Sequence, residues 1–201
     1  MPPKVLNHFK KVDTVLYKVA KEVGGMKDLP NRKGDDLFMD LVDAIVSQQL
    51  SGKVAEVIFN RLKALFPKEK ITPALILKLN DEKIRKIGMS YSKIKYVKDL
   101  ASKVQTKELH LELLENMEDE DVIEELVRVK GIGRWTAEMF LIFTIKRNDV
   151  FSFGDLGLKN AIMKIYKMQP YKPIEAEKIV ARWSPYRSYA ARILWKSLDN
   201  R

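Results

Sequence analysis

The residues best suited to bind a phosphate group lie in the stretch 126–137, which reads Leu-Val-Arg-Val-Lys-Gly-Ile-Gly-Arg-Trp-Thr-Ala. A Gly-x-Gly turn separates the end of one helical pattern from the start of another. Gly131 and Gly133 allow a tight turn and the close approach of a ligand. The unpaired N–H groups at the start of the second helix can hold a phosphate oxygen, and Lys130 and Arg134 add positive charge beside them. A plain turn between two helices is the alternative, because Gly-x-Gly is a common pattern.

The charge of the chain also points to a polyanionic partner. Its 37 Lys and Arg residues and 27 Asp and Glu residues give a formal net charge of +10, and such an excess favours nucleic acid. Residues 83–107 hold eight basic residues and one acid, whereas residues 108–125 hold nine acids and no basic residue. This segregation is expected if one face of the protein meets phosphates, although a lysine-rich, highly soluble surface explains the net charge equally well.

Four blocks of the sequence, which follow one another in the family's order, resemble the helix-hairpin-helix DNA glycosylase superfamily. Residues 128–137 match its hairpin, and residues 149–157 (Asp-Val-Phe-Ser-Phe-Gly-Asp-Leu-Gly) match the loop that carries its invariant aspartate. Residues 44–53 (Ala-Ile-Val-Ser-Gln-Gln-Leu-Ser-Gly-Lys) and 182–195 are similar to its 3-methyladenine DNA glycosylase II branch. The resemblance covers residues 36–195 approximately, and it implies an all-α, two-lobed helical bundle with the active cleft between the lobes.

The resemblance assigns the catalytic role to Asp155. Breaking an N-glycosidic bond builds positive charge on the sugar, which a fixed carboxylate stabilises. The same carboxylate can orient or deprotonate the attacking water. Taken by themselves, the residues also allow Asp155 to cap the helix that begins near Leu156, with Lys159 as an ion-pair partner one turn further on.

Trp135 separates two reaction types within the superfamily. Bifunctional members place a lysine after the hairpin arginine and use its amine as the nucleophile. Trp135 stands at that place, so the resemblance implies a monofunctional enzyme. Alkylated purines such as 3-methyladenine and 7-methylguanine are electron-poor and cationic, and an indole face attracts them. The base pocket implied by the resemblance consists of Trp135, Trp195, Met139 and Leu156, although each tryptophan would also suit a hydrophobic core.

Residues 48–51, Gln-Gln-Leu-Ser, interrupt two apolar helical patterns with polar groups. By resemblance, this loop enters the minor groove and fills the space left by a flipped base, with Gln49 or Leu50 as the wedge; an ordinary polar turn is the alternative. A second glycine turn, at residues 88–93, suits either a backbone contact to phosphate or a simple helix end. The residues expected to contact DNA are Gln48, Gln49, Leu50, Ser51, Lys130, Gly131, Ile132, Gly133 and Arg134.

Metal and cofactor sites are limited by the composition. Hairpins of this superfamily often bind a monovalent cation, which here would lie on the backbone carbonyls of Val127, Val129 and Gly131. The chain has no Cys, which excludes a thiol nucleophile and an iron–sulfur cluster. His8 and His110 lie far apart in the sequence and form no metal-ligand spacing. No redox or organic cofactor is implied.

Hydrophobic residues recur at helical spacing almost throughout the chain, and no alternating pattern predicts a strand. Thr72 suggests an N-cap, Gly88 a helix end and Ser92 the cap of the following helix. We therefore predict one helix-hairpin-helix glycosylase domain over residues 1–201, with the hairpin at about 120–147 and the catalytic loop at 148–157. Helices in the second half of the chain are predicted over residues 119–128, 134–144, 158–167, 174–183 and 185–198.

The remaining features of the sequence concern membrane segments, location and size. No apolar run approaches the ~18–20 residues of a membrane helix, and the start of the chain lacks the apolar segment of a signal peptide. We expect an intracellular monomer whose partner is double-stranded DNA with damaged bases. Larger bacterial members begin with a small α+β domain that 201 residues would not accommodate, so we expect the compact form.

Two competing functions remain open at this point. The first is a glycosylase for oxidised or mismatched bases with lyase activity, which Trp135 and the lack of cysteines disfavour. The second is a hairpin protein that binds DNA without chemistry, which the aspartate at position 155 disfavours.

Overall fold

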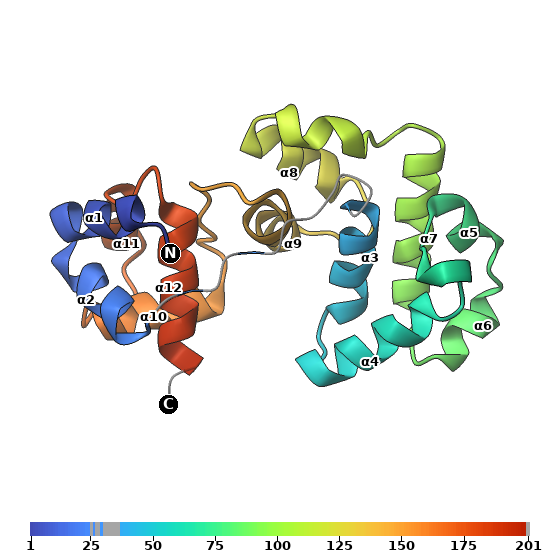
Figure 1. The fold of residues 1–201 in the computed structure, drawn as a ribbon, viewed down its shortest axis with the longest axis horizontal. Helices are drawn as coiled ribbons and strands as arrows, with labels where there is room; N and C mark the ends of the chain where they lie inside the picture. Colours follow the sequence, from blue (N-terminus) through green and yellow to red (C-terminus); the bar gives the residue numbers. More distant parts are fainter. Residues whose placement is uncertain (25, 27–28, 30–36, 200–201) are drawn as a thin grey trace. The chain divides into compact units, whose positions relative to one another are not determined.

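The computed structural model describes residues 1–24, 26, 29 and 37–199. These residues form helices and connecting turns without a strand (Figure 1), which confirms the all-α prediction. The chain divides into two compact units, as predicted for a two-lobed bundle: a terminal unit, Met1–Pro30 with Leu141–Arg201, and a central unit, Asn31–Phe140. Among the described residues, no helix is long and apolar enough to cross a membrane.

The terminal unit is built from helices at both ends of the sequence. Its elements are α1 (Pro3–Val12), α2 (Thr14–Glu22), the π-helical turn η4 (Leu141–Ile145), α10 (Leu156–Ile165), α11 (Pro173–Ala181) and α12 (Arg187–Asp199). α12 packs against α10 and α2, and α1 packs against α2. The core between them includes the fully buried side chains of Phe9, Leu16, Trp183 and Leu194, so burial of apolar surface joins the two ends of the chain.

Asp13, which lies between α1 and α2, is a buried acid with 5% exposure. Its Oδ1 accepts hydrogen bonds from the N–H groups of Val15 at 3.1 Å and Leu16 at 3.0 Å and so caps α2. Its Oδ2 accepts from the Tyr166 hydroxyl at 2.7 Å and from Trp183 Nε1 at 3.0 Å. Burial and the bond to Asp13 raise the pKa of Tyr166, which keeps this hydroxyl a donor. Four donors therefore compensate one buried carboxylate.

The central unit holds the elements α3 (Leu37–Ser47), α4 (Gly52–Lys63), η2 (Pro67–Glu69), α5 (Pro73–Lys78), α6 (Asp81–Lys86), α7 (Tyr91–Gln105), η3 (Leu111–Asn116), α8 (Asp119–Val127) and α9 (Arg134–Phe140). The long helix α7 packs against α3, α5 and α6, while α9 packs against α8 and α3. Leu41, Ile45, Leu100 and Leu126 are fully buried among these helices. The C-terminal ends of α3, α6 and α8, after which the three turns noted in the sequence begin, therefore all lie in the central unit.

Several predicted helix ends are confirmed and two are corrected. Thr72 caps α5 by accepting a hydrogen bond from the N–H of Leu75. The predicted cap at Ser92 is wrong: Ser90 caps α7, because its Oγ accepts from the N–H three residues later at 3.3 Å, the usual N-cap geometry. The helix predicted over 134–144 is α-helical only as far as Phe140, beyond which the backbone widens into the π-helical η4.

We predict that Asp13→Ala lowers the free energy of unfolding by about 3–5 kcal/mol, because it removes a helix cap and leaves the buried Trp183 Nε1 and the partly buried Tyr166 hydroxyl without this acceptor. Thr72→Ala, which removes one capping bond from α5, should cost about 1 kcal/mol. Urea unfolding followed by circular dichroism measures both. Equal losses in the two variants would contradict the role given to Tyr166 and Trp183.

Candidate functional site

Asp155 lies directly before α10 and is its N-cap. Its Oδ1 accepts a hydrogen bond from the N–H of Leu158 at 2.7 Å and a second from Trp195 Nε1 at 3.0 Å. Since Trp195 belongs to α12, two helices hold the same carboxylate oxygen. The capping role that the sequence allowed is therefore present, and it does not compete with a chemical role, because a capped carboxylate is held in one orientation.

Two residues that the sequence analysis missed shape the surroundings of Asp155. A Cβ at Gly157 would lie 3.1 Å from Asp155 Oδ1 and 3.3 Å from Trp195 Cδ1, so glycine gives the indole room to reach the carboxylate. The Phe143 ring lies 5.6 Å from that of Trp195, with an angle of 32° between the ring planes. Phe143 and Leu156 are 39% and 70% exposed, so an accessible apolar surface adjoins the carboxylate.

The segment before α10 is fastened to the start of α12. Asp149 accepts hydrogen bonds from the Arg187 backbone N–H and from its Nε and Nη2, at 3.1, 2.8 and 3.1 Å, and from Ser184 Oγ at 2.7 Å. Burial acts to raise the pKa of Asp149, but the bonds from Arg187 and Ser184 outweigh it and the pKa lies below its usual value. Ser188 Oγ accepts from the N–H of Val150 at 2.9 Å. The loop therefore depends on partners about 38 positions away in the sequence.

The predicted hairpin is formed by α8, a turn and α9. Gly131 has a φ of +83°, and a Cβ there would lie 2.1 Å from Cδ2 of Tyr96, so a side chain does not fit. The buried Ile132 donates its N–H to the Val129 carbonyl at 3.0 Å and closes the turn. A Cβ on the exposed Gly133 would meet no atom within 4 Å. Glycine is therefore required sterically at position 131, whereas at position 133 it leaves open space for a ligand.

Both cations of the turn are paired with carboxylates. The Lys130 N–H donates to Asp99 Oδ2 at 2.9 Å, and its Nζ lies 3.5 Å from Asp99 Oδ1. Arg134 donates to both oxygens of Glu120, at 2.9 and 2.5 Å, and to Glu138 at 3.1 Å. The bond between Arg134 and Glu120 raises the pKa of the arginine and lowers that of the glutamate. The positive charge expected at the turn is therefore largely compensated within the protein.

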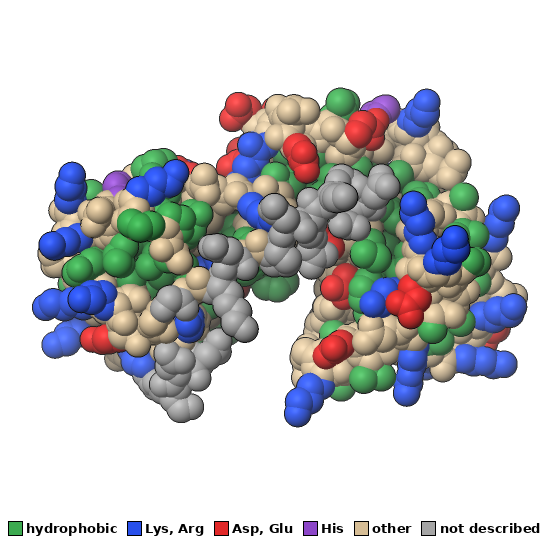
Figure 2. Space-filling view, in the orientation of Figure 1, with side chains coloured by type: hydrophobic (Ala, Val, Ile, Leu, Met, Phe, Trp, Pro, Cys, Tyr) green, Lys and Arg blue, Asp and Glu red, His purple; other side chains and the backbone are tan. Residues whose placement is uncertain are grey.

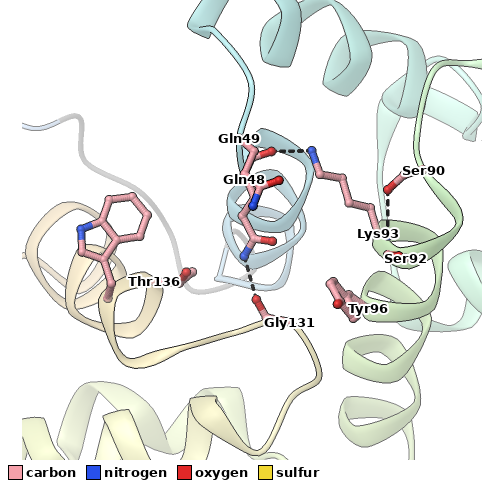
Figure 3. A pocket seen from close by; sticks show the side chains of 9 residues that line it. Gln48, Gln49, Ser90, Ser92, Lys93, Tyr96, Gly131 and Thr136 are labelled. Atoms are coloured by element: carbon pink, nitrogen blue, oxygen red, sulfur yellow. Dashed lines mark hydrogen bonds between the residues drawn. The ribbon is translucent and has the colours of Figure 1, made fainter. Parts of the chain in front are cut away.

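The loop between α3 and α4 is bonded to this turn (Figure 3). Gln48 donates from Nε2 to the Gly131 carbonyl at 2.7 Å, and Lys93 Nζ donates to the carbonyls of Val46 and Gln48, at 2.7 Å each. These two carbonyls lie at the end of α3, where helical acceptors lack partners. Burial lowers the pKa of Lys93. Gln49 follows with a φ of +58°, so the loop departs sharply from helical geometry immediately after its anchored residue.

The three turns singled out in the sequence thus meet at one pocket of the central unit, with a volume of about 590 Å³. Its lining consists of Gln48, Gln49, Ser90, Ser92, Lys93, Tyr96, Gly131, Trp135 and Thr136 (Figure 3). Trp135 is 49% exposed, so its indole is accessible and does not serve as a core residue. Leu50 and Ser51 are exposed beside the pocket lining, and Met139 is partly buried on α9.

Comparisons with known proteins agree on one family. The family model described as "HhH-GPD superfamily base excision DNA repair protein" matches residues 42–185. The chain is 33% identical to DNA-3-methyladenine glycosylase 1 of Schizosaccharomyces pombe, over 94% of this chain and 85% of that protein. It is 35% identical to DNA-3-methyladenine glycosylase of Saccharomyces cerevisiae, over 81% of this chain and 67% of that protein.

Solved structures give the same result. A DNA-3-methyladenine glycosidase from Bacillus halodurans has a TM-score of 0.85 and 33% identity, covering 99% of this chain and 90% of that one. A 3-methyladenine DNA glycosylase of Schizosaccharomyces pombe in complex with abasic DNA has a TM-score of 0.79 and 32% identity, covering 96% of this chain and 95% of that one.

We predict that Gly131→Ala lowers the free energy of unfolding by about 2–4 kcal/mol, because the new methyl group overlaps Tyr96 at a strained φ. Gly133→Ala is the matched control and should change it by less than about 0.5 kcal/mol. Adding Tyr96→Ala to Gly131→Ala should recover part of the loss in urea unfolding. Fully additive losses in the double variant would contradict the steric explanation.

Proposed function

Because the chain belongs to the HhH-GPD superfamily of base excision DNA repair proteins, we propose that it is a monofunctional glycosylase that releases alkylated purines from double-stranded DNA. The observation that carries the proposal is the Asp155 carboxylate, held by two hydrogen bonds at the start of α10. The substrate class follows from relatives at 33% and 35% identity that are named DNA-3-methyladenine glycosylases. Bases of the 3-methyladenine and 7-methylguanine class are therefore the expected products.

The reaction breaks the bond between C1′ of the sugar and a nitrogen of the base, and a water oxygen forms a new bond to C1′. As the base leaves with the bonding electron pair, positive charge builds on the sugar ring. The Asp155 carboxylate stabilises this charge and orients or deprotonates the water. Because Leu158 and Trp195 hold Oδ1, the carboxylate needs little reorganisation during the reaction. The product is an abasic site in an intact strand.

Base recognition in this proposal depends on stacking. A base must leave the duplex before its glycosidic bond is accessible, and a cationic base gains about 0.5–2 kcal/mol on an indole face. Trp135, Trp195, Met139 and Leu156 supply such surfaces. The loop 48–51, with Gln49 or Leu50 as the wedge, would fill the space in the duplex. The bond from Gln48 to the hairpin turn supports this role, since it fixes the loop to the element that grips the backbone.

In the same proposal, the hairpin contacts phosphate through the N–H groups of its turn, and the protein acts as a monomer. The carbonyls of Val127, Val129 and Gly131 would hold a monovalent cation that adds positive charge facing the phosphate. They suit a cation because they lie at and just after the C-terminal end of α8, the negative end of the helix dipole. A carbonyl has two lone pairs, of which Val129 uses one for Ile132 N–H and Gly131 one for Gln48 Nε2.

We predict that Asp155→Asn reduces the rate of base release at least 100-fold while DNA affinity stays within about threefold, as expected when a group stabilises charge in the transition state alone. Asparagine caps helices as well as aspartate does, so the fold should remain. Glu177→Gln, an exposed carboxylate on α11 of the same unit, serves as the control for loss of one negative charge. Single-turnover release of methylated bases, followed by chromatography, measures the rate. Activity within about tenfold of wild type, a cost near 1.4 kcal/mol, would exclude Asp155 as the main catalytic group.

The monofunctional assignment has its own test. Because Trp135 occupies the place of the lyase lysine, we predict no covalent protein–DNA adduct when the protein acts on methylated DNA in the presence of borohydride. The strand should stay intact until alkali or an abasic-site nuclease cuts it. An unshifted lysine is protonated near neutral pH and is a poor nucleophile. A trapped adduct that forms as fast as the base is released would overturn the assignment.

A further inference from the structure

The net charge of the chain is confined to one of its two units. Residues 1–30 and 141–201, the terminal unit, hold 18 Lys and Arg residues and eight Asp and Glu residues, an excess of 10. Residues 31–140, the central unit, hold 19 of each and are neutral. The unit with the hairpin therefore has no excess charge, and both cations of its turn already face carboxylates. The long-range attraction of the protein for a polyanion has its source in the terminal unit.

Within that unit, α1 and α2 carry a surface of exposed lysines, which we call the α1–α2 lysine surface. It consists of Lys4, Lys10, Lys11, Lys18 and Lys21. Figure 2 shows Lys and Arg side chains gathered over these two helices. Residues 1–24 contain two acids: Glu22 is exposed, and Asp13 is buried and bonded to its four donors. The positive charge of this surface is thus almost uncompensated.

A local structural role explains part of this surface. Lys10 and Lys11 lie in the last turn of α1, and Lys21 lies in the last turn of α2, where a cation interacts favourably with the helix dipole. Lys4 lies in the first turn of α1, where the same dipole disfavours a cation. Lys18 lies in the middle of α2, and neither it nor Lys4 has an ion-pair partner among the described residues. The helix dipole therefore does not explain the charges at positions 4 and 18.

We propose that the α1–α2 lysine surface binds backbone phosphates of double-stranded DNA, as a second phosphate contact in addition to the hairpin. The proposal rests on the proposed function, because the ligand is the same DNA. Lysine is suited to this contact, since its ammonium group is a flexible point charge without the geometric demands of a bidentate contact. Such contacts carry no sequence information and supply affinity that decreases with salt. The surface would hold the protein on undamaged and damaged DNA alike.

The test compares two variants of equal net charge in the full chain. One carries Lys4→Gln, Lys11→Gln and Lys18→Gln. The control carries Lys68→Gln, Lys78→Gln and Lys107→Gln, which are exposed lysines of the central unit outside the three site turns. Affinity for a short undamaged duplex is measured by fluorescence anisotropy over a range of salt concentrations. The slope of log K against log salt should become less steep in the first variant by about 0.9 for each phosphate that is no longer neutralised, and should stay within about 0.5 of wild type in the control. Equal slopes in the two variants would overturn the proposal.

A second measurement on the wild-type protein locates the contact directly. Lysine acetylation followed by mass spectrometry should show protection of Lys4, Lys11 and Lys18 by the duplex, and none at Lys78 or Lys107. Unchanged reactivity at all five would also overturn the proposal.

Base release separates this proposal from the proposed function. At saturating protein, both triple variants should release methylated bases at the wild-type single-turnover rate, because the lysines act in binding. If wild type releases no base but the salt slopes differ as expected, the lysine surface stands and the glycosylase proposal fails. If base is released and the slopes are equal, the lysine-surface proposal is wrong and the glycosylase proposal stands.

Discussion

A carboxylate that is proposed to stabilise charge on a sugar must stay in one position, and two hydrogen bonds to one oxygen of Asp155 hold it there. One donor is the N–H of Leu158 in the first turn of α10, and the other is the indole of Trp195 on α12. The position of the carboxylate therefore depends on how α10 and α12 pack against each other. α12 packs on α10 and on α2, so the helices at the start of the chain also support the site.

The same dependence extends to the loop before α10. Arg187, the first residue of α12, binds Asp149 through three donors, so one helix positions both the indole of Trp195 and the segment that leads to Asp155. At the other end of the unit, Asp13 accepts hydrogen bonds from Tyr166 and Trp183 and fixes α2 to the segments that follow α10 and α11. The hydrogen-bonded carboxylates of Asp13 and Asp149 thus fix helices of this unit to one another with a specificity that apolar packing alone does not supply.

The sequence was sufficient for the features that depend on neighbouring residues. Helical periodicity, the Thr72 cap and the Gly-x-Gly turn are local signals, and the structure confirms the elements they predict. The contacts that place the site are not local: Trp195 reaches Asp155 across 40 positions, and Gln48 reaches Gly131 across 83. Gly157 is an example of a non-local requirement: a side chain at this position would crowd the indole of Trp195, which belongs to another helix. The cap of α7 is likewise Ser90 and not the predicted Ser92, because two serines of equal capping preference lie within three residues and propensity does not distinguish them.

The distribution of charge could not be read from the sequence for a related reason. The terminal unit joins the two ends of the chain, and its excess of ten positive charges is the sum of three from residues 1–30 and seven from residues 141–201, two segments that only the fold brings together. A neutral central unit has a physical advantage for the proposed substrate. An alkylated purine is itself cationic, and a like charge about 4 Å away would cost on the order of 1 kcal/mol in water and 4 kcal/mol near a protein surface. Around the Trp135 pocket, Lys130 and Arg134 face carboxylates, and Lys93 donates to two helix-end carbonyls. The cations around Trp135 are thus bonded within the central unit, which limits their repulsion of a cationic base stacked on this indole, while the lysines of α1 and α2 are proposed to attract the phosphate backbone.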